Sequence, residues 1–272
     1  MSATSPIGPS RRQDRHGWRD SRFTRWLPVW RRNARVWSKL AVASVLGNFG
    51  EPLLYLLALG YGLGGFIGRI GDLPYLSFLA SGIVCSSAMI TASFEGMYSA
   101  YTRMAVQRSW GAMLATPLSV ADVVAGEAVW TATKSLVSSV AILIVATLLG
   151  AVSDSRAVLA LPVVALTGLA FGSMALVITA LARSYDFFLY YNTLVLTPVL
   201  LLSGVFFPLD TMPAAVQWGA TALPLYHAVA LVRPLLTHGM VTDAWLHLTV
   251  IAGYAVLMLT VAVLLIQRRL QA

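Results

Sequence analysis

Six long apolar stretches, separated by polar and charged segments, dominate the 272-residue chain. They cover about 40–64, 74–98, 122–149, 158–182, 187–207 and 244–266. A helix needs about 20 apolar residues to cross the hydrocarbon of a bilayer, so each stretch is long enough. Because a backbone in lipid must satisfy its own hydrogen bonds, and no alternating ten-residue segments suggest a barrel, we predict helices. The pattern predicts an all-α membrane protein with six spans within residues 39–272.

Composition supports this class. The chain is 58% apolar and 11% charged, whereas a soluble domain is about 45–50% apolar and about 25% charged. This polar content is too small to cover a water-soluble globule. The single cysteine, Cys85, excludes an intrachain disulfide framework. The first apolar stretch is too long for the h-region of a signal peptide, so we expect it to remain as a span.

The basic residues are distributed unevenly between the two sides of the predicted bundle. Ten of the nineteen lysines and arginines lie between Arg11 and Lys39. With the N-terminus inside, fifteen lie on the inner side and three, Arg69, Arg156 and Arg233, on the outer side. The positive-inside rule therefore predicts that both termini are cytoplasmic. The net charge of +8 indicates a membrane surface as the partner, not nucleic acid.

Residues 18–38 have the pattern of an amphipathic helix in the membrane interface. Apolar side chains fall within about 100° of a helical wheel: Phe23, Trp26, Leu27, Trp30, Ala34 and Trp37. The remainder is basic, with Arg22, Arg25, Arg31, Arg32 and Arg35. A solvated basic tail would explain the arginines but not the tryptophans, so the interfacial helix is favoured, with Pro28 as its start or a kink. Residues 1–17 are predicted to be a disordered tail.

The connection at about 99–121 is predicted to be a cytoplasmic loop with a short helix from Met104 to Ala115. Apolar side chains exposed beside arginines on such a helix suggest docking to a partner protein. The candidate docking residues are Met104, Arg108, Trp110, Met113 and Leu114. A loop helix folded back onto its own bundle explains the pattern equally well.

The outer connection at about 208–243 is unusually apolar for a loop. Prolines interrupt it at Pro208, Pro213, Pro224 and Pro234. Each apolar piece is too short to span the membrane. We therefore predict two short re-entrant helices in the outer leaflet, with neighbouring protein satisfying their ends.

Four ionisable residues fall inside predicted spans: Glu51, Glu95, Glu127 and Lys134. Such residues are costly in lipid and usually face the bundle interior or a polar path. At a rise of about 1.5 Å per residue, Glu51 and Lys134 both lie about 18 Å from the inner surface, which predicts an ion pair between the first and third spans. Glu95 and Glu127 lie nearer the inner surface. Structural pairing and direct handling of substrate or protons both remain open.

Motifs for chemistry within this chain are missing. The sequence has no glycine-rich phosphate loop followed by lysine, so nucleotide hydrolysis is not expected. Its four histidines lack metal-ligand spacing, and one cysteine offers no zinc site. Ser203 and His227 could suggest an intramembrane serine protease, but Ser-Gly pairs are common in membrane helices and this interpretation has little support. The sequence predicts no catalytic residues and no metal site.

Three stretches together resemble a known family. They read EPLLYLLALGYGLG at 51–64; WGAMLATPLS at 110–119 with DVVAGE at 122–127 and WTATK at 130–134; and SGVFFPLD at 203–210 with LPLYH at 223–227 and Arg233-Pro234. With six spans in this order, the chain resembles the ABC-2 type transport permeases. It is most similar to the nodulation protein J, or lipooligosaccharide-exporter, subgroup.

The resemblance implies a permease subunit that dimerises and works with a separate cytoplasmic ATPase. ATP and magnesium would bind to that partner, and this chain would hold no cofactor. The resemblance also implies that the helix near 104–115 couples to the ATPase and that the outer re-entrant helices close the path. The expected function is export of a lipid-linked oligosaccharide, a polysaccharide or a hydrophobic drug across the bacterial cytoplasmic membrane.

Two other classes of function stay open at this point. A proton-coupled secondary carrier would use the intramembrane glutamates, although the internal repeats that many carriers show are absent from this sequence. A non-transporting assembly or immunity protein would bind partners and move nothing.

Overall fold

The structure, a computed structural model, describes residues 24–39 and 41–271, without the side chains of 42–49, 51 and 52. The predicted tail at 1–17 and the first part of the predicted amphipathic helix, 18–23, lie outside the described residues. The first half of the chain contains α1 (Leu27–Ser38), α2 (Ala41–Gly62), α3 (Gly64–Ile67), β1 (Arg69–Ile70), β2 (Leu73–Pro74), α4 (Tyr75–Phe94), the π-helical turns η2 (Glu95–Ser99) and η3 (Thr102–Val106), α5 (Ser109–Leu114) and α6 (Val120–Leu148). The second half contains η4 (Ser155–Leu159), α7 (Ala160–Leu181), α8 (Asp186–Tyr191), η5 (Asn192–Leu196), α9 (Thr197–Leu202), η6 (Leu209–Thr211), α10 (Ala214–Ala220), α11 (Pro224–Leu236) and α12 (Ala244–Gln271).

Four helices of the described chain are long and apolar enough to cross a membrane. They are Tyr75–Val106, Val120–Leu148, Ser155–Leu181 and Ala244–Gln271. Two shorter apolar helices cover Leu53–Ile67 and Asp186–Leu202. The fold is helical, as the hydrophobic pattern predicts, except for the two-residue strands β1 and β2, which pair as an antiparallel hairpin.

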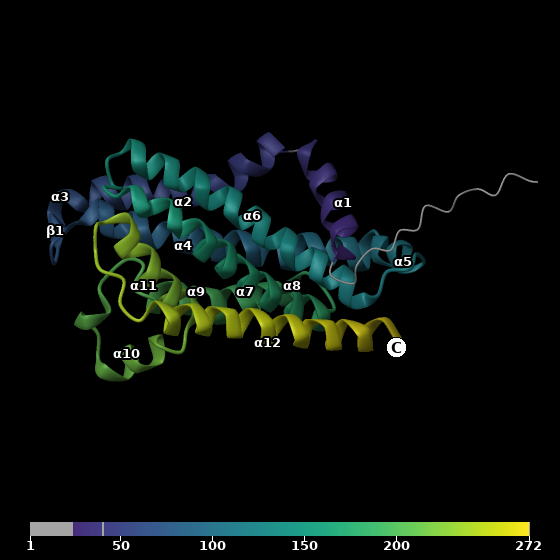
Figure 1. The fold of residues 1–272 in the computed structure, drawn as a ribbon. Coiled ribbons are helices and arrows are strands. Elements are labelled where there is room, and N and C mark those ends of the chain that lie inside the picture. Colours follow the sequence, from purple (N-terminus) through teal and green to yellow (C-terminus); the bar gives the residue numbers. More distant parts are fainter. Residues whose placement is uncertain (1–23, 40, 272) are drawn as a thin grey trace, which may run out of the picture.

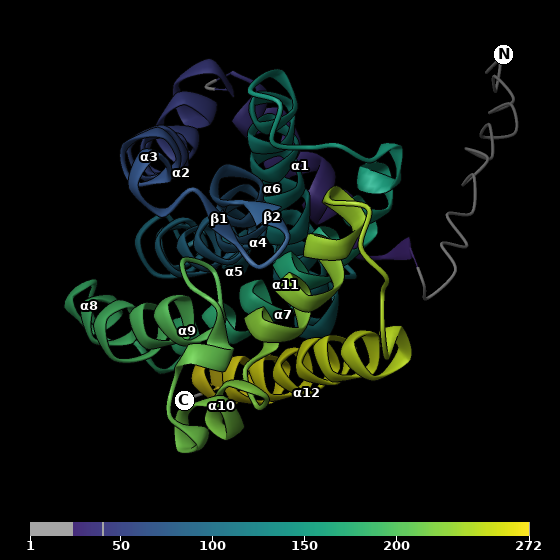
Figure 2. The ribbon, with the colours of Figure 1, turned by 90° about the vertical axis from the view of Figure 1, so that its left-hand side faces the viewer.

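The long helices run side by side, and the connections gather at the two ends of the bundle. In Figure 1, α5 and the C-terminus lie at one end, whereas α3, β1 and α10 lie at the other. Figure 2 views the bundle from the end that carries α3 and β1. The chain therefore has two distinct ends, with the predicted docking loop and the C-terminus on the same one.

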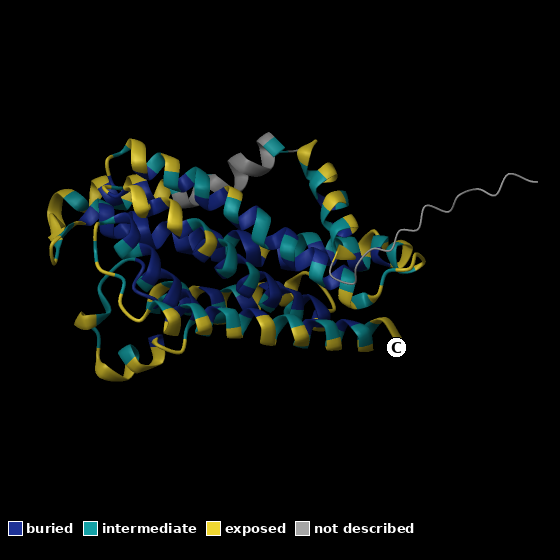
Figure 3. Ribbon diagram, viewed as in Figure 1, coloured by how far each residue is buried: buried dark blue, intermediate teal, exposed yellow. Residues whose placement is uncertain are grey.

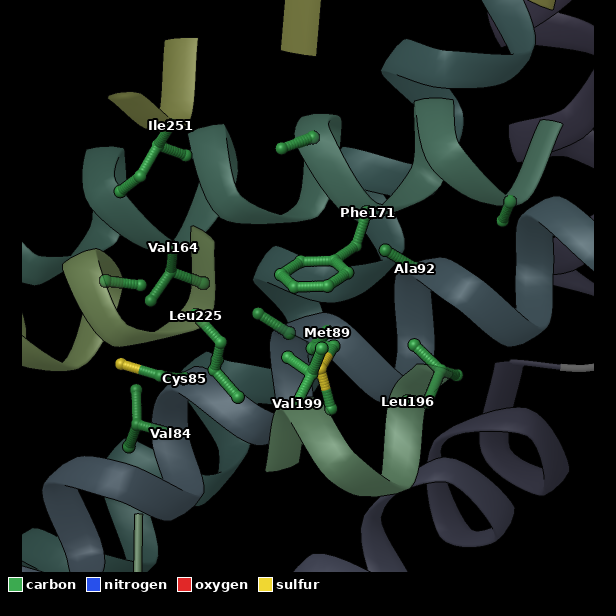
Figure 4. Close-up of a cluster of buried hydrophobic side chains, with 14 of the residues drawn as sticks. Val84, Cys85, Met89, Ala92, Val164, Phe171, Leu196, Val199, Leu225 and Ile251 are labelled. Carbon is green, nitrogen blue, oxygen red and sulfur yellow. The ribbon is translucent and has the colours of Figure 1, made fainter. Parts of the chain in front are cut away.

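The centre of the bundle is α4. In the helix Tyr75–Val106, which begins with α4, 89% of the most apolar 18-residue window is buried, against 22% for α12 at the periphery, and Figure 3 shows the exposed outer face of α12. The small residues of α4 explain this position, because small side chains let neighbouring helices approach closely in a membrane protein. The cluster in Figure 4 joins α4 to its neighbours through Val84, Cys85, Met89, Ala92, Val164, Phe171, Leu196, Val199, Leu225 and Ile251.

The loop at 208–243 contains two short helices, as the proline pattern predicts. Helix α11 packs against α4, α7 and α12 and buries Leu225, Val232 and Leu236. Helix α10 is largely exposed, with Trp218 at 78%. How deep either helix enters the membrane stays a prediction.

Helices α6 and α7 approach each other through two glycines, Gly168 and Gly172, which are spaced as in a GxxxG packing motif. A Cβ added at Gly172 would lie 1.8 Å from Thr131 Oγ1 and 2.7 Å from Thr131 Cβ. At Gly168 the same addition would lie 1.8 Å from Ser135 Oγ. These contacts leave no room for a side chain.

We expect Gly172→Ala to lower the free energy of unfolding by about 1–3 kcal/mol, because a well-packed core must shift to admit the methyl group. Gly253→Ala on α12 is the matched control. Its Cβ would have no neighbour within 4 Å, so it should stabilise the helix by about 0.5–1 kcal/mol. Thermal unfolding in detergent measures both variants. Equal melting temperatures would contradict the close packing of α6 on α7.

Candidate functional site: a buried charge cluster beside α5

Four charged side chains meet near the end of the bundle that carries α5. Arg103 on η3 donates to both oxygens of Glu127 on α6, at 3.0 and 2.5 Å, and its Nη1 lies 2.9 Å from Glu95 Oε1 on η2. Lys134 Nζ lies 3.2 Å from Glu95 Oε2. Glu127 is 0% exposed and Glu95 is 6% exposed. Two acids thus balance two bases in a largely buried network, as such charges require.

Two tryptophans complete the network. Trp130 Nε1 on α6 donates to Glu95 Oε1 at 2.9 Å, and Trp110 Nε1 on α5 donates to Glu127 Oε1 at 3.2 Å. Trp110 is 1% exposed. Since Trp110 belongs to α5 and Glu127 to α6, this hydrogen bond connects the short helix α5 directly to the charged cluster. Any displacement of α5 must therefore strain or break a hydrogen bond to a buried carboxylate.

Local geometry explains why these side chains converge. Glu127 and Lys134 are seven residues apart on α6, two turns along one face. Glu95 and Arg103 belong to two π-helical turns in which the helix from Tyr75 continues to Val106. Such turns are frequent at functional sites in helices. The helix is about 48 Å long at about 1.5 Å per residue, more than the roughly 30 Å of hydrocarbon requires.

The predicted ion pair between Glu51 and Lys134 stays a prediction, because the side chain of Glu51 lies outside the described ones. The structure does bring Lys134 to Glu95, and it joins Glu95 to Glu127 through Arg103. Sequence reasoning placed Arg103 in a loop and missed its role. The sequence does contain a signal for this role, because Arg103 lies eight positions after Glu95, which stands at the end of an apolar stretch.

The expectation for the docking loop needs correction. The helix over 104–115 is shorter than predicted, because Met104 belongs to η3 and α5 begins only at Ser109. Of the candidate docking residues, Met104 and Trp110 are 7% and 1% exposed, so Trp110 packs on its own bundle, which is one of the two alternatives that the sequence left open. The reason is that Trp110 satisfies its indole N–H on Glu127.

The exposed surface of α5 consists of other residues. Met113 and Leu114 are half-buried against the core. The exposed positions within α5 are Gly111 and Ala112, and Arg108, Ala115 and Thr116 are exposed directly next to the helix. Arg108 has φ 51° at the start of the helix. Of the predicted docking residues, Arg108 is thus the one that the described structure places fully on the surface.

Helix α1 also differs from the prediction in what its tryptophans contact. Trp30 Nε1 donates to Thr133 Oγ1 on α6 at 2.9 Å, and Trp37 lies edge-on to Trp130 with ring centroids 6.0 Å apart. Trp26, Trp30 and Trp37 are half-buried, whereas Arg31 is exposed and Arg32 is half-buried. The apolar face that was expected to enter lipid therefore packs at least partly on α6. Pro28 lies in the first turn, where proline fits a helix.

A second candidate site is an apolar cavity of about 700 Å³ between α2–α3, α4 and η5–α9. Its lining is aromatic and aliphatic, including Tyr55, Leu59, Leu63, Tyr75, Met89, Ile90, Phe94, Leu196, Leu200 and Phe206. Asn192 brings a polar group to the same cavity, and its Oδ1 is buried without a hydrogen-bond partner. A cavity of this size and lining suits an apolar ligand.

The protease interpretation fails on geometry. Ser203 Oγ donates to the carbonyl of Val199 at 2.6 Å. His227 is occupied by the carbonyl of Thr221 at 2.8 Å and by His247 Nδ1 at 2.7 Å. No Ser–His hydrogen bond joins Ser203 to His227, and the described residues contain no group of three or more metal-ligand side chains.

Comparison with known proteins identifies the family of this chain. A family model described as "ABC-2 type transporter" matches residues 24–236. Nodulation protein J of Rhizobium leguminosarum bv. viciae is 47% identical over 245 residues, which cover 90% of this chain and 95% of the relative. Nodulation protein J of Rhizobium meliloti (strain 1021) is 44% identical over 90% of this chain and 94% of the relative. Inner membrane transport permease YadH of Escherichia coli (strain K12) is 26% identical over 75% of this chain and 78% of the relative.

Proposed function

The chain belongs to the ABC-2 type transporter family, and from this premise we propose that it exports an amphiphilic, lipid-linked oligosaccharide. It is a multi-pass permease subunit of the inner membrane and not itself an enzyme, because this family lacks an ATPase domain and pairs with a separate ATPase subunit that binds ATP. The observation that carries the coupling of this chain to an ATPase is the hydrogen bond from Trp110 on α5 to the buried Glu127 on α6.

We propose that the end of the bundle with α5 and the C-terminus faces the cytoplasm. The positive-inside distribution supports this orientation, since the arginines near α5 and at the C-terminal end of α12 share that end. In this orientation α2 with α3, and the helix Asp186–Leu202, complete a set of six spans. Helix α1 lies at the inner membrane surface, and α10 and α11 lie at the outer end.

We propose that the exposed side of α5 is the surface that binds the ATPase. ATP binding would shift the pair between inward- and outward-open states only if ATP binds the two states with different affinity. The push on α5 would pass through Trp110 to Glu127, and from there through Arg103 to Glu95. Glu127 belongs to α6, and Arg103 and Glu95 belong to the η2–η3 turns of the helix Tyr75–Val106. A displacement of α5 would therefore be transmitted to both of these spans.

The apolar cavity supports an apolar tail as part of the cargo. It is bounded by α2–α3, α4 and η5–α9. We propose that two copies form the working unit and enclose the path between them. A hydrophobic drug would suit the same lining, and the resemblance to the lipooligosaccharide-exporter subgroup favours the glycolipid.

A proton-coupled carrier is less well supported. Such a carrier needs carboxylates that are free to take up and release protons. Both oxygens of Glu95 and of Glu127 are occupied by arginine, lysine or indole donors. This pairing favours a structural and transmitting role for the two glutamates.

The proposed function is tested by co-expression with the ATPase encoded nearest to it and by transport into inverted vesicles. Co-purification of the two proteins, together with ATP-dependent uptake of a fluorescent lipid-linked oligosaccharide, is the expected result. Uptake driven by a proton gradient without nucleotide would establish the carrier instead. Co-purification without movement of any amphiphile would indicate an assembly protein.

We expect Ile90→Trp to block export by filling the apolar cavity, which Ile90 lines. The initial uptake rate should fall at least about tenfold while the ATPase still co-purifies, because Ile90 lies away from α5. Leu257→Trp, on the exposed face of α12 at 56% exposure, is the control for adding an indole to a span. Normal uptake by Ile90→Trp would remove the cavity from the path.

A further inference from the structure

A smaller cavity lies between α1, the η2–η3 turns and α6. Its volume is about 310 Å³, at the lower end of the roughly 300–1,000 Å³ range of ligand pockets. The lining carries three cationic side chains, Arg32, Arg103 and Lys134, and one carboxylate, Glu95. Figure 1 shows α1 beside α6 near the end of the bundle that carries α5.

Two buried hydrogen-bond donors in this lining have no acceptor. Asn33 is 3% exposed, and its Oδ1 accepts from Arg32 Nη1 at 3.1 Å, so that the unpaired amide group is its Nδ2. Trp37 Nε1 is likewise buried without a partner. Native proteins rarely leave buried donors unpaired, because each loses its bonds to water without replacement. The two unpaired donors therefore indicate that a bound group with acceptor atoms occupies this cavity.

The charge around the cavity is positive. Arg103 and Lys134 are balanced by Glu95 and Glu127 within the buried cluster. Arg32 adds a further cation, and none of the carboxylates that the structure describes forms an ion pair with it. Burial, and beside it the charge of Arg103, lower the pKa of the Arg32 guanidinium more than the charge of Glu127 raises it. An anion in the cavity would offset both effects.

We propose that this cavity binds the phosphate group of an anionic phospholipid. Arg32 supplies the charge, and Asn33 Nδ2 and Trp37 Nε1 supply neutral N–H donors, a set that matches the acceptor oxygens of a phosphate. Arg31 and Arg35 are exposed on the same helix and attract anionic lipid to this surface. The choice of a lipid as the source of the phosphate rests on the proposed position of α1 at the inner membrane surface.

The test is native mass spectrometry of the full chain in a mild detergent with added phosphatidylglycerol or phosphatidylcholine. The wild-type protein should retain phosphatidylglycerol in preference to phosphatidylcholine. Arg32→Gln and Asn33→Leu should each weaken phosphatidylglycerol binding at least about tenfold, the usual loss for a hydrogen bond to a charged group. Arg31→Gln and Arg35→Gln remove the same charge from exposed positions and should change binding less than about twofold.

Equal losses in Arg31→Gln and Arg32→Gln would overturn the site in favour of general attraction to a basic helix. Equal retention of the two lipids by the wild-type protein would overturn it as well. Displacement of phosphatidylglycerol by millimolar inorganic phosphate would overturn the lipid as the occupant. The comparison of Arg32→Gln with Arg31→Gln decides the matter even if Asn33→Leu does not fold. None of these measurements depends on transport, so their failure is distinct from failure of the proposed function.

Discussion

Replacing Glu127 by glutamine is expected to abolish export and to lower the free energy of unfolding by about 3–5 kcal/mol, the range for breaking a buried ion pair from one side. The carboxylate is fully buried and receives two bonds from Arg103 and one from Trp110. Glutamine carries no charge and turns an N–H group towards one of these donors. The cluster then holds two cations and a single carboxylate. In the proposed mechanism, α5 also loses its connection to the spans.

Unfolding in detergent and export in vesicles measure this effect separately. Arg103→Gln with Glu127→Gln restores the balance, because Glu95 and Lys134 remain as a pair. The double variant should be more stable than the sum of the two single effects predicts, by at least about 1 kcal/mol. Asp186→Asn removes an exposed carboxylate and should stay within about 0.5 kcal/mol of the wild type. Strictly additive effects would show that the network does not act as a unit.

Replacing Gly111 by tryptophan is expected to remove the ATPase from the purified complex and to stop ATP-dependent export. Gly111 lies on the exposed side of α5, and a Cβ there has nothing within 4 Å. The new indole therefore leaves the fold intact and projects into the surface proposed as the seat of the ATPase. We expect at least about a tenfold loss of co-purified ATPase, equivalent to about 1.4 kcal/mol, with an unchanged melting temperature.

Gly219→Trp is the matched control for this substitution. Gly219 also lies in a short exposed helix, α10, at the opposite end of the bundle, and its added Cβ would have no neighbour within 4 Å. This variant should keep the ATPase. If both variants lose the partner, the effect is not local to α5, and if Gly111→Trp keeps it, the ATPase sits elsewhere. Trp110→Ala does not separate these cases, because Trp110 is buried and bonded to Glu127.

Much of the architecture follows from the hydrophobic pattern by itself. Apolar stretches of about 20 residues must form helices in lipid, whatever surrounds them, because no water is present to satisfy the backbone. Proline spacing predicts the starts of the short helices α10 and α11 for a similarly local reason, since Pro213 and Pro224 lie where these helices begin, whereas Pro234 lies inside the last turn of α11. The ABC-2 family was also recognisable from three ordered motifs.

The candidate site was only partly predictable. Sequence reasoning selected Glu95, Glu127 and Lys134 because a charge in a span needs a reason to be there. The sequence leaves open whether Trp110 contacts a partner or its own bundle and predicts a loop at Arg103, because helical periodicity identifies an apolar side chain without showing what covers it. Whether such a side chain faces a partner or its own bundle depends on contacts across 17 to 24 positions of the chain.

The sequence by itself thus determined that the chain is a helical membrane protein, which segments are apolar, and which family it belongs to. These properties rest on local composition and on the cost of an unpaired backbone in lipid. Only the tertiary structure decided which charges pair, how α5 is fastened to α6 and which donors stay without an acceptor. Those outcomes depend on where separate helices pack against one another, which brings together side chains that no local pattern links.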